Sequence, residues 1–188
     1  MYNRFQIIHY LRKYGWNEKR HIDTSAIKDV YEHFFDEYEK DDYTTFVFTP
    51  YPPFQKVLEF WSSFGDLTID FLGKDTRKKS IVINSDAVLN GGIHNTIQTA
   101  LYYQKQFFPV AMVEPVPCFI CIDNDGCFYG VNYCGGVNKF SNDFFEVIDV
   151  FINHYQQLKR IILYFLESEG AQGATGKPPA KDFKVTEY

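Results

Sequence analysis

The chain has 188 residues, a length that is usual for one domain and sufficient for a sizeable core. Hydrophobic residues make up 45% of it and aromatic residues 19%, which is typical of a soluble globular protein. The net charge of −5, with no long basic stripe, disfavours direct nucleic-acid binding. Since no run of eighteen apolar residues occurs, no membrane span is predicted.

The N-terminal sequence and the cysteine content indicate an intracellular protein. Residues 1–16 form an amphipathic stretch with charges throughout, and they lack the apolar centre and cleavage site of a signal peptide. Four cysteines do not suggest a disulfide framework, and a reducing compartment would keep them as thiols. We therefore expect a cytoplasmic location.

Two helices are predicted before residue 40. The first runs from about residue 3 to residue 13, and Gly15 ends it. The second begins at Thr24 or Ser25, which are both good N-cap residues. Apolar residues recur at helical spacing in both segments. They are Phe5, Ile7, Ile8 and Leu11 in the first helix, and Ile27, Val30, Tyr31 and Phe34 in the second.

The middle of the chain mixes strands with helices. A short strand is predicted at 44–48, and a third helix follows the prolines at 50–53 and ends at Gly65. Strands are predicted at 67–71, 80–83 and 110–113, with a helix at about 94–107 between the last two. The third helix is expected to bury Phe54, Val57, Leu58 and Trp61.

A hairpin with its turn at Asp123-Asn124-Asp125-Gly126 is the clearest local signal. Asp and Asn bond their own backbone, and Gly accepts a positive φ. Apolar and aromatic residues on both sides suit a pleated, half-buried surface. A turn at 134–136 follows, and then a long helix that is capped by Ser141 or Asn142 and runs to about residue 166.

One domain is predicted at 1–167, with strands in the middle of the chain and helices on both flanks, which defines an α+β class. From residue 168 onward, Gly and Pro accumulate in a polar segment that has little to bury. Residues 168–188 are therefore expected to be a flexible tail.

The four cysteines first suggest a zinc site, because Cys118 and Cys121 have CxxC spacing and Cys127 and Cys134 follow. On a strand, however, positions three apart point to opposite faces, so packing as small apolar side chains is favoured. The acidic turn at 123–126 imitates the start of a calcium loop, but its twelfth position is Cys134 instead of Glu. No metal ion or cofactor is predicted.

Catalytic motifs are missing from the sequence. It has no GxSxG, P-loop, HExxH or Gly-rich dinucleotide fingerprint, and its five histidines are scattered. We therefore predict that the protein is not an enzyme and has no catalytic residues. A zinc-dependent or thiol-based enzyme is a weaker alternative.

Six short segments form a pattern through their order and spacing. They are Gly15-Trp16 with Arg20, FWSSFGDLTI at 60–69, INSD at 83–86, PVA at 109–111, ICIDNDGCFYG at 120–130 and SNDFF at 141–145. Together they resemble the SUKH superfamily, and most of all its SUKH-3 immunity proteins, over roughly residues 14–153. The chain departs from that pattern at Asp66, where a second Gly is usual, and in the hairpin, where cysteines replace aliphatic residues.

The resemblance implies a SUKH-like single domain with a central mixed or antiparallel sheet flanked by helices. It implies a bacterial immunity protein that binds and neutralises the toxin domain of a polymorphic toxin, such as a nuclease or a deaminase. It brings no catalytic residues. Some relatives in the wider superfamily are regulatory modules, so a regulatory or scaffold module with a non-toxin partner is the alternative.

Candidate partner contacts fall into three groups, and each has a plainer interpretation. The acidic stretch Asp36, Glu37, Glu39, Asp41 and Asp42 either is a solvated helix end or docks a basic partner. Trp16 either packs under the first two helices, with Arg20 pairing with a carboxylate or capping carbonyls, or the two residues form an aromatic–Arg anchor that faces the partner. Tyr129, Asn132 and Tyr133 either pack near the hairpin or contact the partner. The sequence leaves the toxin, the binding face and the oligomeric state open.

Overall fold

The computed structural model of the protein describes residues 3–38, 52–72, 77–85, 107–115, 118–132 and 137–153. The helices α1 (Arg4–Arg12), α2 (Ser25–Tyr38) and α3 (Gln55–Phe64) come first in the chain. The strands that follow are β1 (Leu67–Leu72), β2 (Lys78–Ile83), β3 (Phe107–Glu114), β4 (Cys118–Asp123), β5 (Phe128–Asn132) and β6 (Val137–Lys139). Helix α5 (Phe144–Asn153) comes last.

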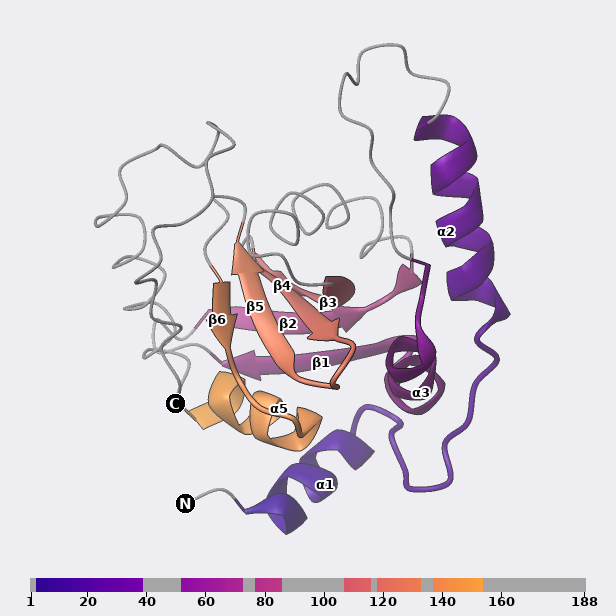
Figure 1. The fold of residues 1–188 in the computed structure, drawn as a ribbon. Coiled ribbons are helices and arrows are strands. Elements are labelled where there is room, and N and C mark those ends of the chain that lie inside the picture. The colour runs from indigo at the N-terminus through magenta and orange to yellow at the C-terminus, as the bar shows by residue number, and fades with distance from the viewer. Residues whose placement is uncertain are drawn as a thin grey trace, which may run out of the picture.

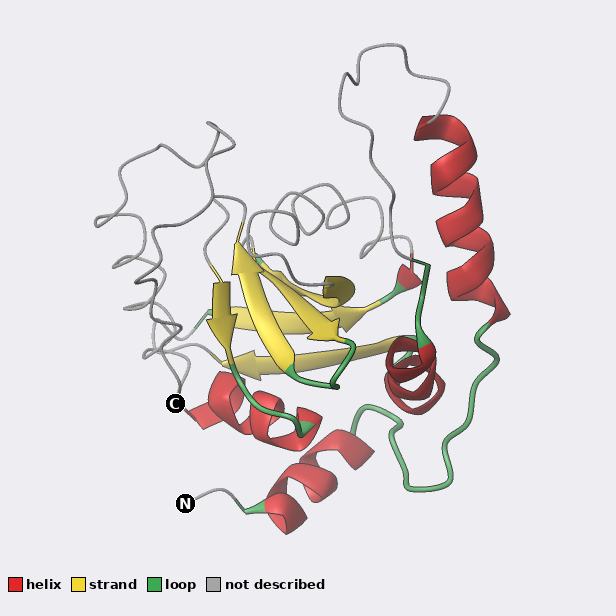
Figure 2. Ribbon diagram, viewed as in Figure 1, coloured by secondary structure: helices red, strands yellow, loops and turns green. Residues whose placement is uncertain are grey.

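The six strands form one sheet in which the strand order follows the chain, from β1 to β6, and every neighbouring pair is antiparallel. Helices α1, α3 and α5 lie together along one side of this sheet, and α2 stands at its flank (Figure 1). Figure 2 shows the same separation of helices from strands. The predicted α+β class is confirmed, and the sheet is antiparallel.

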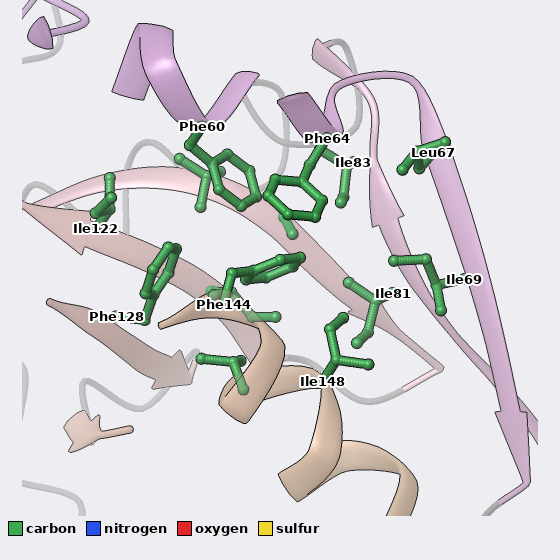
Figure 3. Close-up of a cluster of buried hydrophobic side chains, with 14 of the residues drawn as sticks. Phe60, Phe64, Leu67, Ile69, Ile81, Ile83, Ile122, Phe128, Phe144 and Ile148 are labelled. Atoms are coloured by element: carbon green, nitrogen blue, oxygen red, sulfur yellow. The ribbon is translucent and has the colours of Figure 1, made fainter. Parts of the chain in front are cut away.

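Aromatic side chains from α3 and α5 fill the space between these helices and the sheet (Figure 3). Phe144 of α5 lies edge-on to Phe60 and Phe64 of α3, with ring centroids 4.7 and 4.8 Å apart. Phe128 of β5 approaches Phe60 from the sheet at 5.6 Å. Because edge-to-face pairs add stabilisation beyond the area they bury, this cluster holds both helices against the sheet.

The two faces of the sheet differ in how they are covered. In β1, Leu67, Ile69 and Phe71 are buried, whereas Thr68 and Leu72, which point to the other face, are exposed. In β4 all six residues are buried, so both faces are covered there. The second face is thus open at β1 and buried toward β6. Its buried cluster comprises Phe107, Phe119, Cys121, Cys127, Tyr129, Val131 and Val137.

Arg4 joins the first helix to the last. Its guanidinium lies 4.2 Å from the ring centroid of Phe145 and forms an ion pair with the carboxylate of Asp143. Asp143 also caps α5, since its Oδ1 accepts the backbone N–H of Phe145 at 3.0 Å. The prediction of Ser141 or Asn142 as the cap is therefore wrong. Ser141 instead accepts the backbone N–H of Asp143 at 3.1 Å.

Helix α1 buries the predicted apolar stripe except for its first residue. Ile7 and Leu11 are buried, but Phe5, predicted to lie on the apolar stripe, is 75% exposed. Tyr10 and Tyr14 are half-buried and reach β1. The buried side follows residues three and four apart, which places position 5 on the opposite side of the helix.

Strand β3 begins earlier than predicted and contains a proline. Phe107, predicted as the last residue of a helix, is instead the first residue of β3 and pairs with Asp123. The register shifts between Pro109 and Ala111. Pro lacks the N–H that a ladder needs, and an irregularity of this kind is where an inner strand tolerates it. Strand β6 has no predicted counterpart, since three residues are too few to show a period.

Several predicted elements lie outside the described residues. They are the strand at 44–48, most of the helix at 94–107, the turn at 134–136, the last helix beyond residue 153 and the tail at 168–188. Of the helices that the structure describes, none has the length and apolar character needed to cross a membrane.

Candidate functional site

Trp16, one of the predicted partner contacts, is built into the core. Gly15 precedes it at φ 87°, a conformation that favours glycine, and the chain turns there after α1. The indole ring stacks on Phe64 at 5.8 Å and meets Phe145 edge-on at 5.3 Å. Only 7% of Trp16 is exposed, so the packing interpretation accounts for its placement.

Arg20 and the residues after it bond to the end of α3. The Arg20 Nη2 donates to the carbonyl oxygen of Gly65 at 2.6 Å, and the N–H of Ile22 donates to the carbonyl of Ser62 at 3.0 Å. The last carbonyls of a helix have no partner within it, and a cation is favourable beside them. Residues 15–22 and 65–66 therefore form one unit, which we call the α3 clasp.

The turn from α3 into β1 explains two positions of the sequence pattern. A Cβ at Gly65 would lie 2.6 Å from Ile22 Cδ1 and 2.7 Å from both Nε1 and the carbonyl oxygen of Trp61. Asp66 has φ 58°, and its N–H donates to the carbonyl of Ile83 at 2.6 Å. Asp enters this left-handed region more readily than most residues. It can therefore stand where the SUKH-3 pattern usually has a second glycine.

Asp123 organises the hairpin turn from a buried position, 1% exposed. Its Oδ1 accepts the backbone N–H groups of Asp125 at 3.0 Å and Cys127 at 2.8 Å. Its Oδ2 accepts the hydroxyl of Tyr129 at 2.9 Å. Gly126 has φ 85° and donates its N–H to the carbonyl of Asp123 at 2.9 Å, which confirms the predicted turn.

The three candidate contacts after this turn have different placements. Tyr129 is 4% exposed and packs against Phe107, with ring centroids 4.8 Å apart. Asn132 is the last residue of β5, where it pairs with Cys118 of β4. The side chain of Asn132 and all of Tyr133 lie outside the described residues. The structure therefore places Tyr129 in the core and leaves the other two as predictions.

The cysteines divide between the faces of the sheet. Cys118 belongs to the core beneath the helices and Cys121 to the second-face cluster, so the two side chains point apart as predicted. Burial raises the pKa of the Cys118 thiol to about 12, which keeps it protonated. The Cys127 thiol donates to Oδ1 of Asn142 at 2.8 Å. In the described ranges, which exclude Cys134, no three His, Cys, Asp or Glu residues are grouped to hold a metal ion.

The acidic candidates lie at and after the end of α2. Asp36 and Glu37 belong to the helix, while their side chains and the whole of Glu39, Asp41 and Asp42 lie outside the described residues. Earlier in α2, Asp29 and Glu32 are exposed, whereas Ile27 and Tyr31 are buried. Positions 29, 32 and 36 are spaced three and four apart and so share one face of the helix.

Asp29 and Glu32 are additions that sequence reasoning missed. The sequence did contain the information, because Asp29 and Glu32 precede Asp36 at helical spacing within the predicted helix. The hydroxyl contacts of Tyr10 and Tyr14 with β1 were missed as well. These contacts join residues 60 and 56 positions apart in the chain, and no local pattern indicates them.

The fold and the candidate residues define an α+β protein whose motif residues hold its core together and whose helix α2 exposes Asp29 and Glu32 beside Lys28. A model of the SUKH-3 immunity protein family matches residues 5–154. The chain therefore belongs to the SUKH-3 immunity protein family. Searches of curated proteins and of solved structures give no match.

The α3 clasp generates a stability prediction. Gly65→Ala should lower the free energy of unfolding by about 1–3 kcal/mol, because its methyl group meets a tryptophan ring and a backbone carbonyl that cannot move far. Asp66→Gly is the matched control, since it relieves a positive φ and should change stability by less than about 1 kcal/mol. Denaturant unfolding measures both. A Gly65→Ala protein as stable as wild type would contradict the packing described.

The hairpin generates a second prediction. Tyr129→Phe removes the hydroxyl that donates to the buried Asp123, and it should lower the free energy of unfolding by about 1–2 kcal/mol. Asp125→Ala, at an exposed position of the same turn, should have a smaller effect. Thermal or denaturant unfolding compares the two variants. A Tyr129→Phe protein as stable as wild type would show that the Tyr129 hydroxyl is not structurally important.

Proposed function

We propose that this chain binds a cognate toxin domain and neutralises it by forming a stoichiometric protein–protein complex. The observation that carries the proposal is the family match over 5–154, which extends from the first turn of α1 to the end of α5. Inhibition by binding requires a stable scaffold and a complementary surface, and it needs no reactive group. The buried aromatic core and the antiparallel sheet are suited to be such a scaffold.

The acidic side of α2 and the residues after it are the proposed docking surface. A net charge of −5 favours a basic partner, and complementary charge speeds capture. If the toxin is a nuclease, its active cleft must be positive to hold phosphate groups. The exposed Asp29 and Glu32 extend the acidic candidates at 36–42 toward the N-terminal end of α2. This surface is proposed to cover or occupy such a cleft.

The remaining candidates are proposed as secondary contacts. Trp16 and Tyr129 are buried, which favours an effect through folding. Arg20 is bonded to the end of α3 and is partly exposed, and Asn132 and Tyr133 follow the hairpin. Substitution separates the two roles. A variant that keeps its stability but loses binding belongs to the interface, and one that loses stability belongs to the scaffold.

Co-expression tests the function directly. The chain should be expressed together with the C-terminal domain encoded by the neighbouring large gene, and cell survival and co-purification should be scored. We expect rescue together with a stable one-to-one complex. Folded protein that neither rescues growth nor co-purifies would contradict the proposal and favour a regulatory module with a non-toxin partner.

The acidic surface has its own test in that complex. Neutralising Asp36, Glu37, Glu39, Asp41 and Asp42 together to Asn and Gln should slow association and flatten its dependence on salt. Stopped-flow or surface-plasmon measurements at several salt concentrations give the association rates. Unchanged kinetics in a folded variant would exclude this surface as the docking site.

A matched pair of double variants controls for net charge. Asp29→Asn with Glu32→Gln removes two exposed charges from α2, and Glu114→Gln with Asp125→Asn removes two exposed charges from β3 and the hairpin turn. Both change the net charge equally. Only the α2 pair should slow association. Equal effects would mean that total charge, and not the α2 surface, governs capture.

A further inference from the structure

The two edge strands of the sheet differ in length. β6 has three residues, whereas β1 has six and pairs with β2 along its whole length. A strand at the edge of a sheet presents unpaired N–H and C=O groups that can template pairing with another chain. A short edge offers few such groups, so β1 is the edge that needs protection.

Tyr10 of α1 and Tyr14, which follows that helix, show which groups of β1 face outward. Tyr10 and Tyr14 both donate their hydroxyls to the carbonyl oxygen of Asp70, Tyr14 at 2.9 Å. That carbonyl therefore points away from β2. Because backbone direction alternates along a strand, the N–H and C=O groups of Thr68 and Leu72 point the same way.

These two hydroxyls fill the acceptor capacity of the Asp70 carbonyl. A backbone carbonyl oxygen has two lone pairs, and each hydroxyl takes one. The rings stand together, with centroids 5.4 Å apart and the Tyr14 hydroxyl 3.4 Å from that of Tyr10. Burial raises the pKa of Tyr10, so its hydroxyl keeps the proton it donates. An added strand could bond to this carbonyl only by displacing a tyrosine.

Asp70 lies at the middle of the outward-facing groups. On each side of it, β1 has one further outward residue, Thr68 before and Leu72 after. Both of these side chains are exposed, Leu72 to 70%. A strand added to this edge could therefore form hydrogen bonds only to Thr68 and Leu72, on either side of the blocked Asp70 carbonyl. Such isolated bonds do not make a stable sheet.

We propose that Tyr10 and Tyr14 close the β1 edge against strand addition, and that without their hydroxyls β1 pairs with β1 of a second copy of this chain. Two copies related by a two-fold axis bring their edges together antiparallel. A register that sets Asp70 against Leu72 avoids opposing two Asp70 carboxylates. The inference does not depend on the toxin or on the proposed function.

The test is the mass of the protein in solution as a function of concentration. We expect Tyr10→Phe combined with Tyr14→Phe to self-associate with a dissociation constant about tenfold or more below that of wild type, since two hydrogen bonds no longer compete with the strand. Sedimentation velocity or light scattering measures the mass. Tyr129→Phe, which deletes a hydroxyl bond away from this edge, should behave like wild type.

A third variant shows whether β1 is the surface used. Leu72→Pro, added to the double variant, removes an outward N–H at the end of the strand and should restore the wild-type mass. Circular dichroism confirms folding; if the double variant is unfolded, Tyr14→Phe alone replaces it. Wild-type mass in a folded variant at every concentration overturns the proposal. Association of the double variant that persists when Leu72→Pro is added also overturns it, as does a wild-type protein that associates as strongly as the double variant.

Discussion

The junction between α3 and β1 is the constraint on which the described fold depends. Gly65 allows Trp61 and Ile22 to approach the backbone, and Asp66 turns the chain so that β1 starts beside Ile83 of β2. Arg20 bonds to the carbonyl of Gly65 and so ties the segment after α1 to the same point. One turn thereby sets the position of α3, and of the segment that follows α1, relative to the first two strands. The residues of the SUKH-3 pattern that gather at this junction therefore have a structural role: they hold the fold together.

Local signals predicted most of the fold. The hairpin turn at 123–126, the start of α2 and the end of α3 each depend on residues close in the chain, and each is confirmed. Differences arise where distant partners decide. Phe107 joins a strand because Asp123 lies across from it, and Phe5 stays exposed because α1 docks through Ile7 and Leu11.

The candidate site shows the same division between local and distant causes. Trp16 was selected as an aromatic residue of the kind found in binding hot spots, and Tyr129 for its place after the hairpin turn. Both are buried, and burial depends on neighbours that the sequence does not identify. The acidic face of α2 depends only on helical spacing, so Asp29 and Glu32 could have been found. Selecting contact residues by type alone thus favours those that a protein uses for its own core.

The bond between Arg4 and Asp143 has a consequence for synthesis on the ribosome. The two residues are 139 positions apart, so α1 is made long before its partner helix α5 exists. Until then Ile7 and Leu11 have no α5 to pack beside, and the nascent chain carries this apolar side uncovered. Contacts of such long range also slow folding, because a large loop must close before they form. Of the described helices, α1 is therefore expected to be among the last to dock.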